Sequence, residues 1–160
     1  MDQRLKLEVV DRREFVVGGA AAAMLVALLG RTGTASAQGK QPTFDDAMKA
    51  IVGDKKADES QVAIKLPEIA ENGNTVPYSV TVESPMSDDN YVKAIHVLSS
   101  GNPAPNIATF HFTPMSGKAE ISSRMRLAKT QDIYAVAELS NGAIHVGKRT
   151  VKVTIGGCGG

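Results

Sequence analysis

The chain has 160 residues, with 18 basic and 17 acidic side chains and a formal net charge of +1. This near-neutral balance argues against nucleic acid or an anionic membrane as the main partner. A single cysteine excludes an internal disulfide, so hydrophobic packing must hold the fold together.

Residues 1–37 have the features of a twin-arginine export signal. The pair Arg12-Arg13 is followed by an apolar, glycine- and alanine-rich run over residues 15–29, and residues 35–37 read Ala-Ser-Ala, which suits signal peptidase. The apolar run is shorter than the roughly twenty residues that span a bilayer, and no cysteine near the cleavage site could carry a lipid. We therefore expect a periplasmic mature chain without a membrane anchor.

The remaining residues, 38–160, have the size of one domain and open with a predicted helix. Thr43 is the expected N-cap, Asp46 completes a capping box, and Gly53 ends the helix. The residues at helical spacing are Phe44, Ala47, Met48 and Ile51. We expect this apolar face to dock on the domain's own core or cover a sheet edge, and docking to a partner is the alternative.

Apolar and polar residues then alternate with a period of two, which predicts half-buried strands. The expected strands are 62–66, 76–82, 91–98, 107–112, 119–127, 133–139 and 144–155. Asn141-Gly142 predicts a two-residue hairpin loop, because both residues accept positive φ. About seven strands without intervening helices predict an all-β fold, an immunoglobulin-like antiparallel β-sandwich over residues 38–155.

Residues 156–160 read Gly-Gly-Cys-Gly-Gly and place Cys158 between two glycine pairs. The glycines are Gly156, Gly157, Gly159 and Gly160. They have no side chains to pack, so we expect a flexible arm that hinges between Ile155 and Gly156. Fully extended, the arm reaches about 17 Å, and a cysteine thiolate forms reversible bonds to sulfur. The composition predicts a swinging arm with a reactive tip.

Other candidate sites have ordinary structural explanations. The three histidines fall inside predicted strands, where a structural role is expected: His96, His111 and His145. Two adjacent carboxylate pairs are expected to be cap and turn residues: Asp45-Asp46 and Asp88-Asp89. The sequence holds no zinc, phosphate-loop or serine-hydrolase motif, so no catalytic residue, metal or cofactor is predicted.

An exported protein that ends in the pentapeptide 156–160 resembles the SoxY family, the sulfur-carrier subunits of the SoxYZ complexes of thiosulfate oxidation. The resemblance implies that Cys158 is the covalent attachment site and that the glycines form the carrier arm. It also implies a SoxZ-like partner in a heterodimer and a SoxAX-like haem c enzyme that joins thiosulfate to the cysteine. A SoxB-like hydrolase would then release sulfate, and a sulfane dehydrogenase would act where one exists. The protein would be a carrier and not an enzyme.

Two other hypotheses stay open. The chain could be an exported β-sandwich interaction module, tethered to its partner by a disulfide of Cys158. It could also be a periplasmic redox or copper-handling protein that uses Cys158 with Met86 and Met115. A tether predicts one stable covalent partner, copper handling predicts retained metal, and a carrier predicts a changing set of sulfur adducts.

Overall fold

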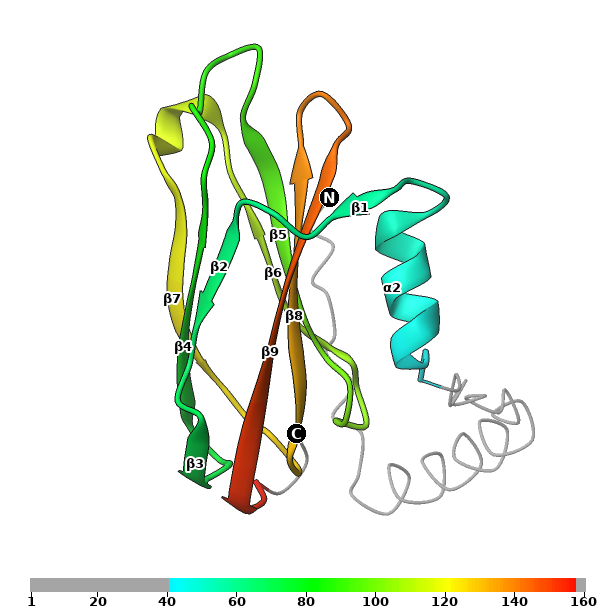
Figure 1. Ribbon diagram of the computed structural model, residues 1–160, viewed down its shortest axis with the longest axis vertical. Helices are drawn as coiled ribbons and strands as arrows, with labels where there is room; N and C mark the ends of the chain where they lie inside the picture. Colours follow the sequence, from blue (N-terminus) through cyan, green and yellow to red (C-terminus); the bar gives the residue numbers. More distant parts are fainter. Residues whose placement is uncertain (1–40, 158–160) are drawn as a thin grey trace, which may run out of the picture. The chain divides into compact units, whose positions relative to one another are not determined.

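The computed structural model describes residues 41–157, so the predicted export signal over residues 1–37 lies outside the described residues. In chain order the elements are α2 (Phe44–Val52), β1 (Ala57–Asp58), β2 (Val62–Lys65), β3 (Ile69–Asn72), β4 (Val76–Val82), β5 (Val92–Ser99), β6 (Asn106–His111), the 3-10 helix η1 (Pro114–Ser116), β7 (Ala119–Met125), β8 (Gln131–Leu139) and β9 (Ile144–Ile155) (Figure 1). No helix in this part of the chain is long and apolar enough to cross a membrane.

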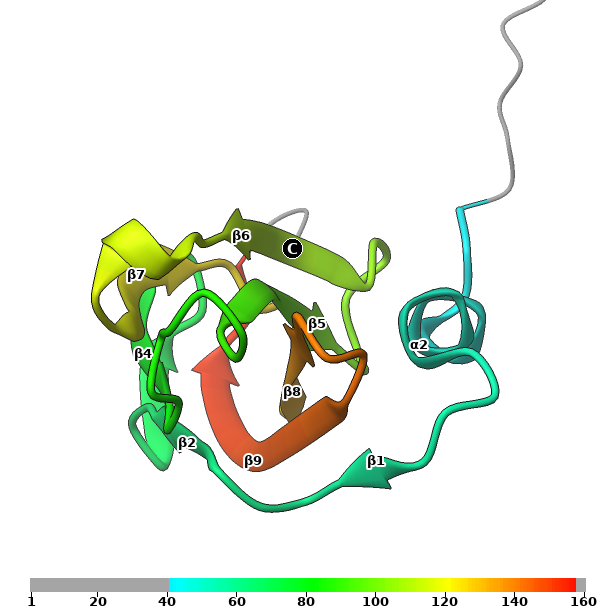
Figure 2. The ribbon, with the colours of Figure 1, turned by 90° about the horizontal axis from the view of Figure 1, so that it is seen from above.

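The strands form two facing sheets, and α2 lies against the outer face of the larger sheet (Figure 2). The larger sheet has the order β1-β9-β8-β5-β6, with β3 also paired to β9, and the smaller sheet has the order β2-β4-β7. Fully buried aliphatic side chains of both sheets fill the space between them; examples are Val80, Ile95, Ile133 and Val151. A mainly β fold with a short N-terminal helix is therefore confirmed.

The predicted helix and its capping box are confirmed in α2. The N–H of Asp46 donates to Thr43 Oγ1 at 3.2 Å, and the N–H of Thr43 donates to Asp46 Oδ2 at 3.2 Å. These two bonds satisfy amides that the first helical turn leaves without partners. The buried residues under the helix form a second core cluster: Ala47, Leu98, Val136 and Ile144. The helix thus docks on its own domain, as expected.

The prediction of antiparallel pairing throughout is wrong at β9, whose outer edge carries two short parallel strands. Ala57 of β1 lies opposite Ile144, and Ala70 of β3 lies opposite Val153. Between β1 and β3 the chain passes through β2, which pairs with β4 of the other sheet. Residues 57–72 therefore contribute β1 to the larger sheet, then β2 to the smaller sheet, and then β3 to the larger sheet again. Strands this short show too little alternation to be recognised from sequence, and residues 54–59 look only like a charged connector.

Gly147 lets this run of chain cross β9 at close range. A Cβ atom at Gly147 would lie 2.8 Å from Val62 Cγ1 and 2.9 Å from the Val62 carbonyl oxygen. A side chain at this position would push β2 away from β9. The absence of one therefore allows the chain to change sheets between β1 and β3.

The β8–β9 hairpin has a three-residue loop, so the predicted two-residue loop is wrong. The N–H of Leu139 donates to the Ala143 carbonyl at 3.0 Å, and the N–H of Gly142 donates back to the Leu139 carbonyl at 3.0 Å. Of the two predicted turn residues, Gly142 has positive φ (84°) and Asn141 does not. Asn141 instead accepts the Ala143 N–H through Oδ1 at 2.9 Å, which closes the longer loop.

Candidate functional site

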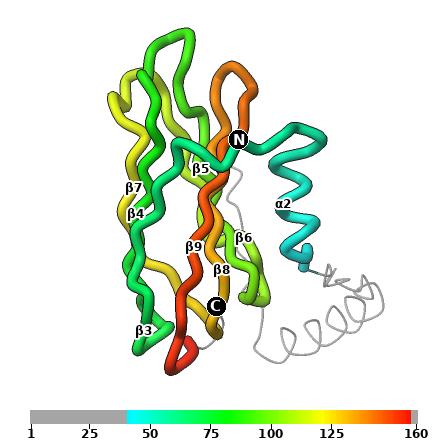
Figure 3. Tube along the Cα trace, viewed as in Figure 1, coloured from blue at the N-terminus to red at the C-terminus, as the bar shows by residue number. Residues whose placement is uncertain are grey.

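The predicted attachment residue Cys158 lies outside the described residues, as do Gly159 and Gly160. The structure describes the base of the predicted arm, Gly156 and Gly157, and its neighbours among residues 41–157. This base lies at the end of the sandwich where β3 and β9 finish, at the opposite end of the sheets from η1 (Figures 1 and 3).

Two different neighbours hold the last part of β9 in place. β8 pairs with β9 as far as Val151, and β3 then flanks β9 from Lys152 to Ile155. On the β8 side, the N–H of Val153 donates to Thr130 Oγ1 at 2.9 Å. The strand that leads to the predicted arm is therefore supported by β3 as far as Ile155 and on the β8 side as far as Val153.

The backbone hydrogen bonds do not stop at Ile155. The N–H of Gly73 donates to the Ile155 carbonyl at 2.8 Å, and the Gly73 carbonyl accepts the N–H of Leu127 at 2.7 Å. The Leu127 carbonyl in turn accepts the N–H of Gly157 at 2.9 Å. We call this arrangement of Gly73, Leu127, Gly156 and Gly157 the glycine junction. The glycine composition predicts a hinge between Ile155 and Gly156, whereas the bonded backbone continues through Gly157.

The glycine junction has no room for side chains. A Cβ atom on Gly73 would overlap the Leu127 carbonyl oxygen, and one on Gly156 would overlap the Ala128 carbonyl oxygen. A Cβ atom on Gly157 would lie 2.7 Å from the Gly73 carbonyl oxygen, and Gly157 is buried. Close backbone contact thus requires glycine at these three positions. Sequence reasoning explained Gly156 and Gly157 by flexibility alone and missed Gly73.

Side-chain amides hold the loop over residues 126–130 that forms the other half of the junction. Asn102 Nδ2 donates to the Arg126 carbonyl at 2.9 Å, and Asn102 Oδ1 accepts the N–H of Ala128 at 3.0 Å. Gln131, which is buried, donates through Nε2 to Asn102 Oδ1 at 2.8 Å. Asn102 therefore binds the peptide groups on both sides of Leu127. Sequence reasoning did not identify Asn102 or Gln131, because amide residues in loops are common.

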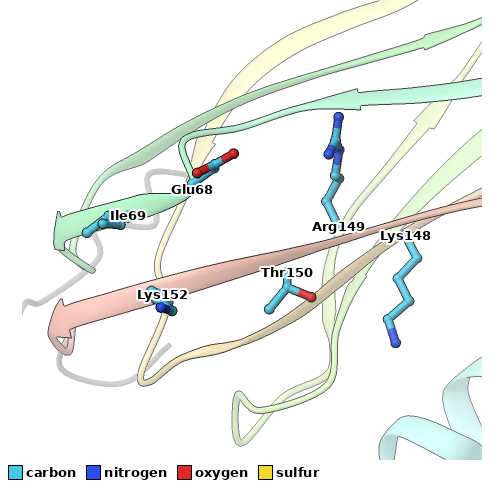
Figure 4. A pocket seen from close by; sticks show the side chains of 6 residues that line it. All are labelled: Glu68, Ile69, Lys148, Arg149, Thr150 and Lys152. Atoms are coloured by element: carbon cyan, nitrogen blue, oxygen red, sulfur yellow. The ribbon is translucent and has the colours of Figure 1, made fainter.

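A shallow hollow of about 530 Å³ lies beside the C-terminal half of β9 (Figure 4). Its lining residues are Glu68, Ile69, Lys148, Arg149, Thr150 and Lys152. Lys148 and Arg149 extend to opposite sides of β9, and Lys148 Nζ is paired with Asp132 Oδ2 at 2.9 Å. All six lining residues are exposed, so the hollow is charged surface and not a formed ligand site.

The acids and bases with shifted pKa values, both beside this hollow and on β5, make structural contacts. Hydrogen bonds from Thr150 Oγ1 at 2.6 Å and from Lys148 lower the pKa of Asp132, and the bond to Asp132 raises the pKa of Lys148. On β5, burial lowers the pKa of His96, whose Nδ1 lies 3.1 Å from Thr109 Oγ1. The glycine junction itself is built from peptide groups, so it offers no acid or base to a neighbouring thiol.

The predicted minor candidates do not assemble into a site. His96 and His111 lie on the paired strands β5 and β6, while His145 is buried on β9, which β8 separates from β5. Within residues 41–157, no three His, Cys, Asp or Glu side chains are close enough to hold a metal ion. Met86 is only 5% exposed, whereas Met115 is 97% exposed.

The carboxylate pairs occupy the places that the sequence predicts. Asp45 and Asp46 lie in the first turn of α2, where Asp46 completes the capping box. Asp88 and Asp89 lie in the loop between β4 and β5, as the two central residues of a turn closed by the N–H of Asn90 donating to the Ser87 carbonyl at 3.1 Å. Both pairs are thus cap and turn residues.

Comparison with known proteins identifies relatives of this fold. The family model described as sulfur oxidation protein SoxY matches residues 48–158. The solved structure of the sulfur carrier protein SoxY from Chlorobium limicola f thiosulfatophilum is 35% identical, covers 71% of this chain and 97% of its own, and gives a TM-score of 0.57. No curated protein matches the chain.

A more distant likeness concerns the fold alone. A superoxide reductase (neelaredoxin) from Ignicoccus hospitalis is 17% identical, with 58% of this chain and 80% of that one covered and a TM-score of 0.52. At this identity the likeness carries no argument about activity. The family model and the 35% identical structure confirm the resemblance stated on the C-terminal pentapeptide: the chain belongs to the SoxY family of sulfur oxidation proteins.

Proposed function

We propose that this protein is a periplasmic sulfur carrier that holds intermediates of thiosulfate oxidation covalently on Cys158. The observation that carries the proposal is the SoxY family match, which extends to Cys158 itself. The related solved structure is described as a sulfur carrier protein. The supported end of β9 adds a physical argument, because it delivers the arm from a defined place on the sandwich.

The proposed cycle begins with an oxidation and continues with a hydrolysis. A cysteine thiolate and thiosulfate join through a new S–S bond and lose two electrons, which a SoxAX-like haem c enzyme accepts. Water then cleaves the terminal S–S bond in a SoxB-like hydrolase, which releases sulfate and two protons and leaves a persulfide anion on Cys158. A sulfane dehydrogenase, where one exists, would oxidise the remaining sulfur.

The carrier role assigns catalysis to these partner proteins. A free cysteine has a pKa of about 8.5, so activation of the thiol requires a charged or basic neighbour. The glycine junction provides peptide groups alone. A partner enzyme that receives the arm would therefore supply the base, which limits oxidation of the thiol between encounters.

Export and assembly form part of the same proposal. We assign residues 1–37 to twin-arginine export and residues 156–160 to the carrier arm, and we expect a heterodimer with a SoxZ-like subunit. Export of folded proteins suits a chain that leaves with a partner already bound. The immunoglobulin-like class of the sandwich is also proposed here, on the support of two facing sheets with mainly antiparallel pairing.

The decisive experiment is the intact mass of the mature protein from cells grown on thiosulfate, measured before and after reduction. Reducible adducts of added sulfur or thiosulfate on Cys158 are the expected result. A bare thiol in every preparation would contradict the proposal. A single fixed disulfide to one protein would instead support the tether, and retained copper would support the metal-handling hypothesis.

A variant pair sharpens the test. Cys158→Ser should fold and bind its subunit normally but abolish thiosulfate turnover. The matched control is Cys158→Ser combined with Met115→Cys, which restores one exposed thiol on η1, at the opposite end of the sheets. Turnover by the control would show that an exposed thiol elsewhere suffices, and it would contradict the proposed carrier role of Cys158.

A further inference from the structure

We propose that Gly73, Asn102 and Gln131 are positioning residues that fix the base of the proposed carrier arm, so that the backbone is held in place through Gly157. The inference rests on the proposed role of Cys158 but concerns different residues. It assigns a function to the glycine junction, which lies in three segments far apart in the sequence. Gly156 and Gly157 then belong to the fixed base, and only Gly159 and Gly160 are left for the flexible role that the sequence predicts.

Leu127 uses both of its backbone polar groups in the glycine junction. Its N–H donates to the Gly73 carbonyl at 2.7 Å, and its carbonyl accepts the N–H of Gly157 at 2.9 Å. The Leu127 side chain is fully buried in the main core. The residue that receives the arm is thus anchored by its side chain and by both of its backbone groups.

The neighbours of Leu127 are held by two side-chain amides. Asn102 binds the Arg126 carbonyl and the Ala128 N–H, and Gln131 holds Asn102 through Nε2 at 2.8 Å. Gln131 Oε1 also accepts the N–H of Gly101 at 2.8 Å, so its amide is used at both ends. A buried amide with this many partners resists rotation, because any turn would leave polar groups without hydrogen bonds.

Fixing Gly157 shortens the distance that Cys158 can reach from the sandwich. If the arm hinged between Ile155 and Gly156, three Cα–Cα steps would separate the last anchored residue from Cys158, about 11 Å at full extension. With Gly157 held, one step of about 3.8 Å remains. A partner enzyme must then bring its active site to the end of the sandwich formed by residues 73, 102 and 126–130. The position of the junction, and not the length of the arm, would then decide which surface of the protein contacts the enzyme.

Amide hydrogen exchange tests the junction directly, on the protein as purified with any subunit that accompanies it. We expect the Gly157 amide to exchange more than about tenfold more slowly than those of Gly159 and Gly160. Exchange of Gly157 at the rate of Gly160 would overturn the inference, even if Cys158 carries sulfur. Protection of Gly157 on a protein without sulfur adducts would overturn only the proposed function.

Variants of the supporting residues test the positioning role. Asn102→Leu should speed Gly157 exchange and lower thiosulfate turnover, and Asn102→Asp, which keeps the acceptor for Ala128, should do both more weakly. Asn141→Leu is the matched control, since it removes a turn hydrogen bond at the other end of the sandwich. Equal effects of the Asn102 and Asn141 variants would contradict the inference.

Gly73 provides a second line of evidence that leaves the arm sequence untouched. Gly73→Ala should increase the mobility of a nitroxide attached to Cys158 and lower turnover, without slowing the reaction of Cys158 with a small thiol reagent. Gly117→Ala is the control for lost stability, because Gly117 has a φ of 70° and nothing within 4 Å of its added Cβ. Unchanged label mobility in a folded Gly73→Ala protein would refute the positioning role.

Discussion

The carbonyl oxygen of Leu127 accepts the N–H of Gly157 at 2.9 Å, and the side chain of Leu127 is fully buried. Leu127 lies in the connection between β7 of the smaller sheet and β8 of the larger one. The base of the arm is therefore attached where the chain passes from one sheet to the other. A disturbance of the packing between the sheets at this point would reach residues 155–157 by two routes: directly from the Leu127 carbonyl to Gly157, and through Gly73, which is hydrogen-bonded to both Leu127 and Ile155.

Replacement of Leu127 tests how much the core contributes at this position. Leu127→Ala should lower the free energy of unfolding by about 2–5 kcal/mol, because it removes a buried side chain and leaves a cavity. Urea unfolding of the purified protein measures this change. Met115→Ala, at a residue that is 97% exposed, should change the stability by less than about 0.5 kcal/mol. A similar loss in both variants would contradict the assignment of Leu127 to the core.

The capping box of α2 makes a smaller contribution. Thr43→Ala should cost about 1 kcal/mol, because the N–H of Asp46 loses its acceptor at the start of the helix. Thr75→Ala, at an exposed residue between β3 and β4, serves as the control. Equilibrium unfolding of the two variants should separate them, and equal stabilities would show that the cap adds nothing.

The β8–β9 hairpin depends on the conformation of one glycine. Gly142→Ala should destabilise the protein by about 1 kcal/mol, since φ at this residue is 84° and L-residues with a Cβ atom disfavour that region. Gly142→Asn should cost less, because asparagine tolerates the left-handed region better. Thermal unfolding measures the order of the two variants. The reverse order would indicate that the loop does not keep this conformation.

The pair of Asp132 and Lys148 predicts a dependence of stability on pH. Hydrogen bonds from Thr150 and Lys148 lower the pKa of Asp132 below the unfolded value of about 3.9. The stabilisation is therefore present above about pH 4 and is lost as the pH falls through the folded pKa. Asp132→Asn should lower the stability at pH 7, by at most about 1 kcal/mol because the pair is partly exposed, and should flatten the acid decline.

Unfolding in urea at a series of pH values between 2 and 8 checks this prediction. Asp54→Asn, at an exposed residue just after α2, is the matched control and should keep the wild-type decline. The contradictory outcome is an unchanged slope in Asp132→Asn. Lys148 contributes no further change between pH 5 and 8, because its raised pKa keeps it charged throughout that range.

Local sequence signals predicted much of the fold. Thr43 and Asp46 define the start of α2, and alternating apolar residues mark β4, β5, β7, β8 and β9. These signals work because capping and alternation depend on residues a few positions apart. The short strands β1 and β3 were missed, since their partner β9 lies more than 80 residues later in the chain.

The candidate site also depends on contacts between residues far apart in the sequence, which sequence patterns do not reveal. Cys158 and its glycines are visible as a motif, but a glycine looks the same in sequence whether it is required for flexibility or for close contact. Gly73 and Gly157 are brought together only by the fold, and Leu127 is hydrogen-bonded to both of them. Asn102 and Gln131 act through backbone groups of the loop at residues 126–130, and peptide groups carry no sequence signature.

The two parallel strands at the edge of β9 also bear on the order in which the chain folds. β1 and β3 lie in the first third of residues 41–157, and both pair with the last strand, β9. During synthesis these two strands have no pairing partner until β9 has left the ribosome. Pairing between segments so distant in the chain is slow. The larger sheet is therefore completed only when β9, the strand that leads to the predicted arm, is in place.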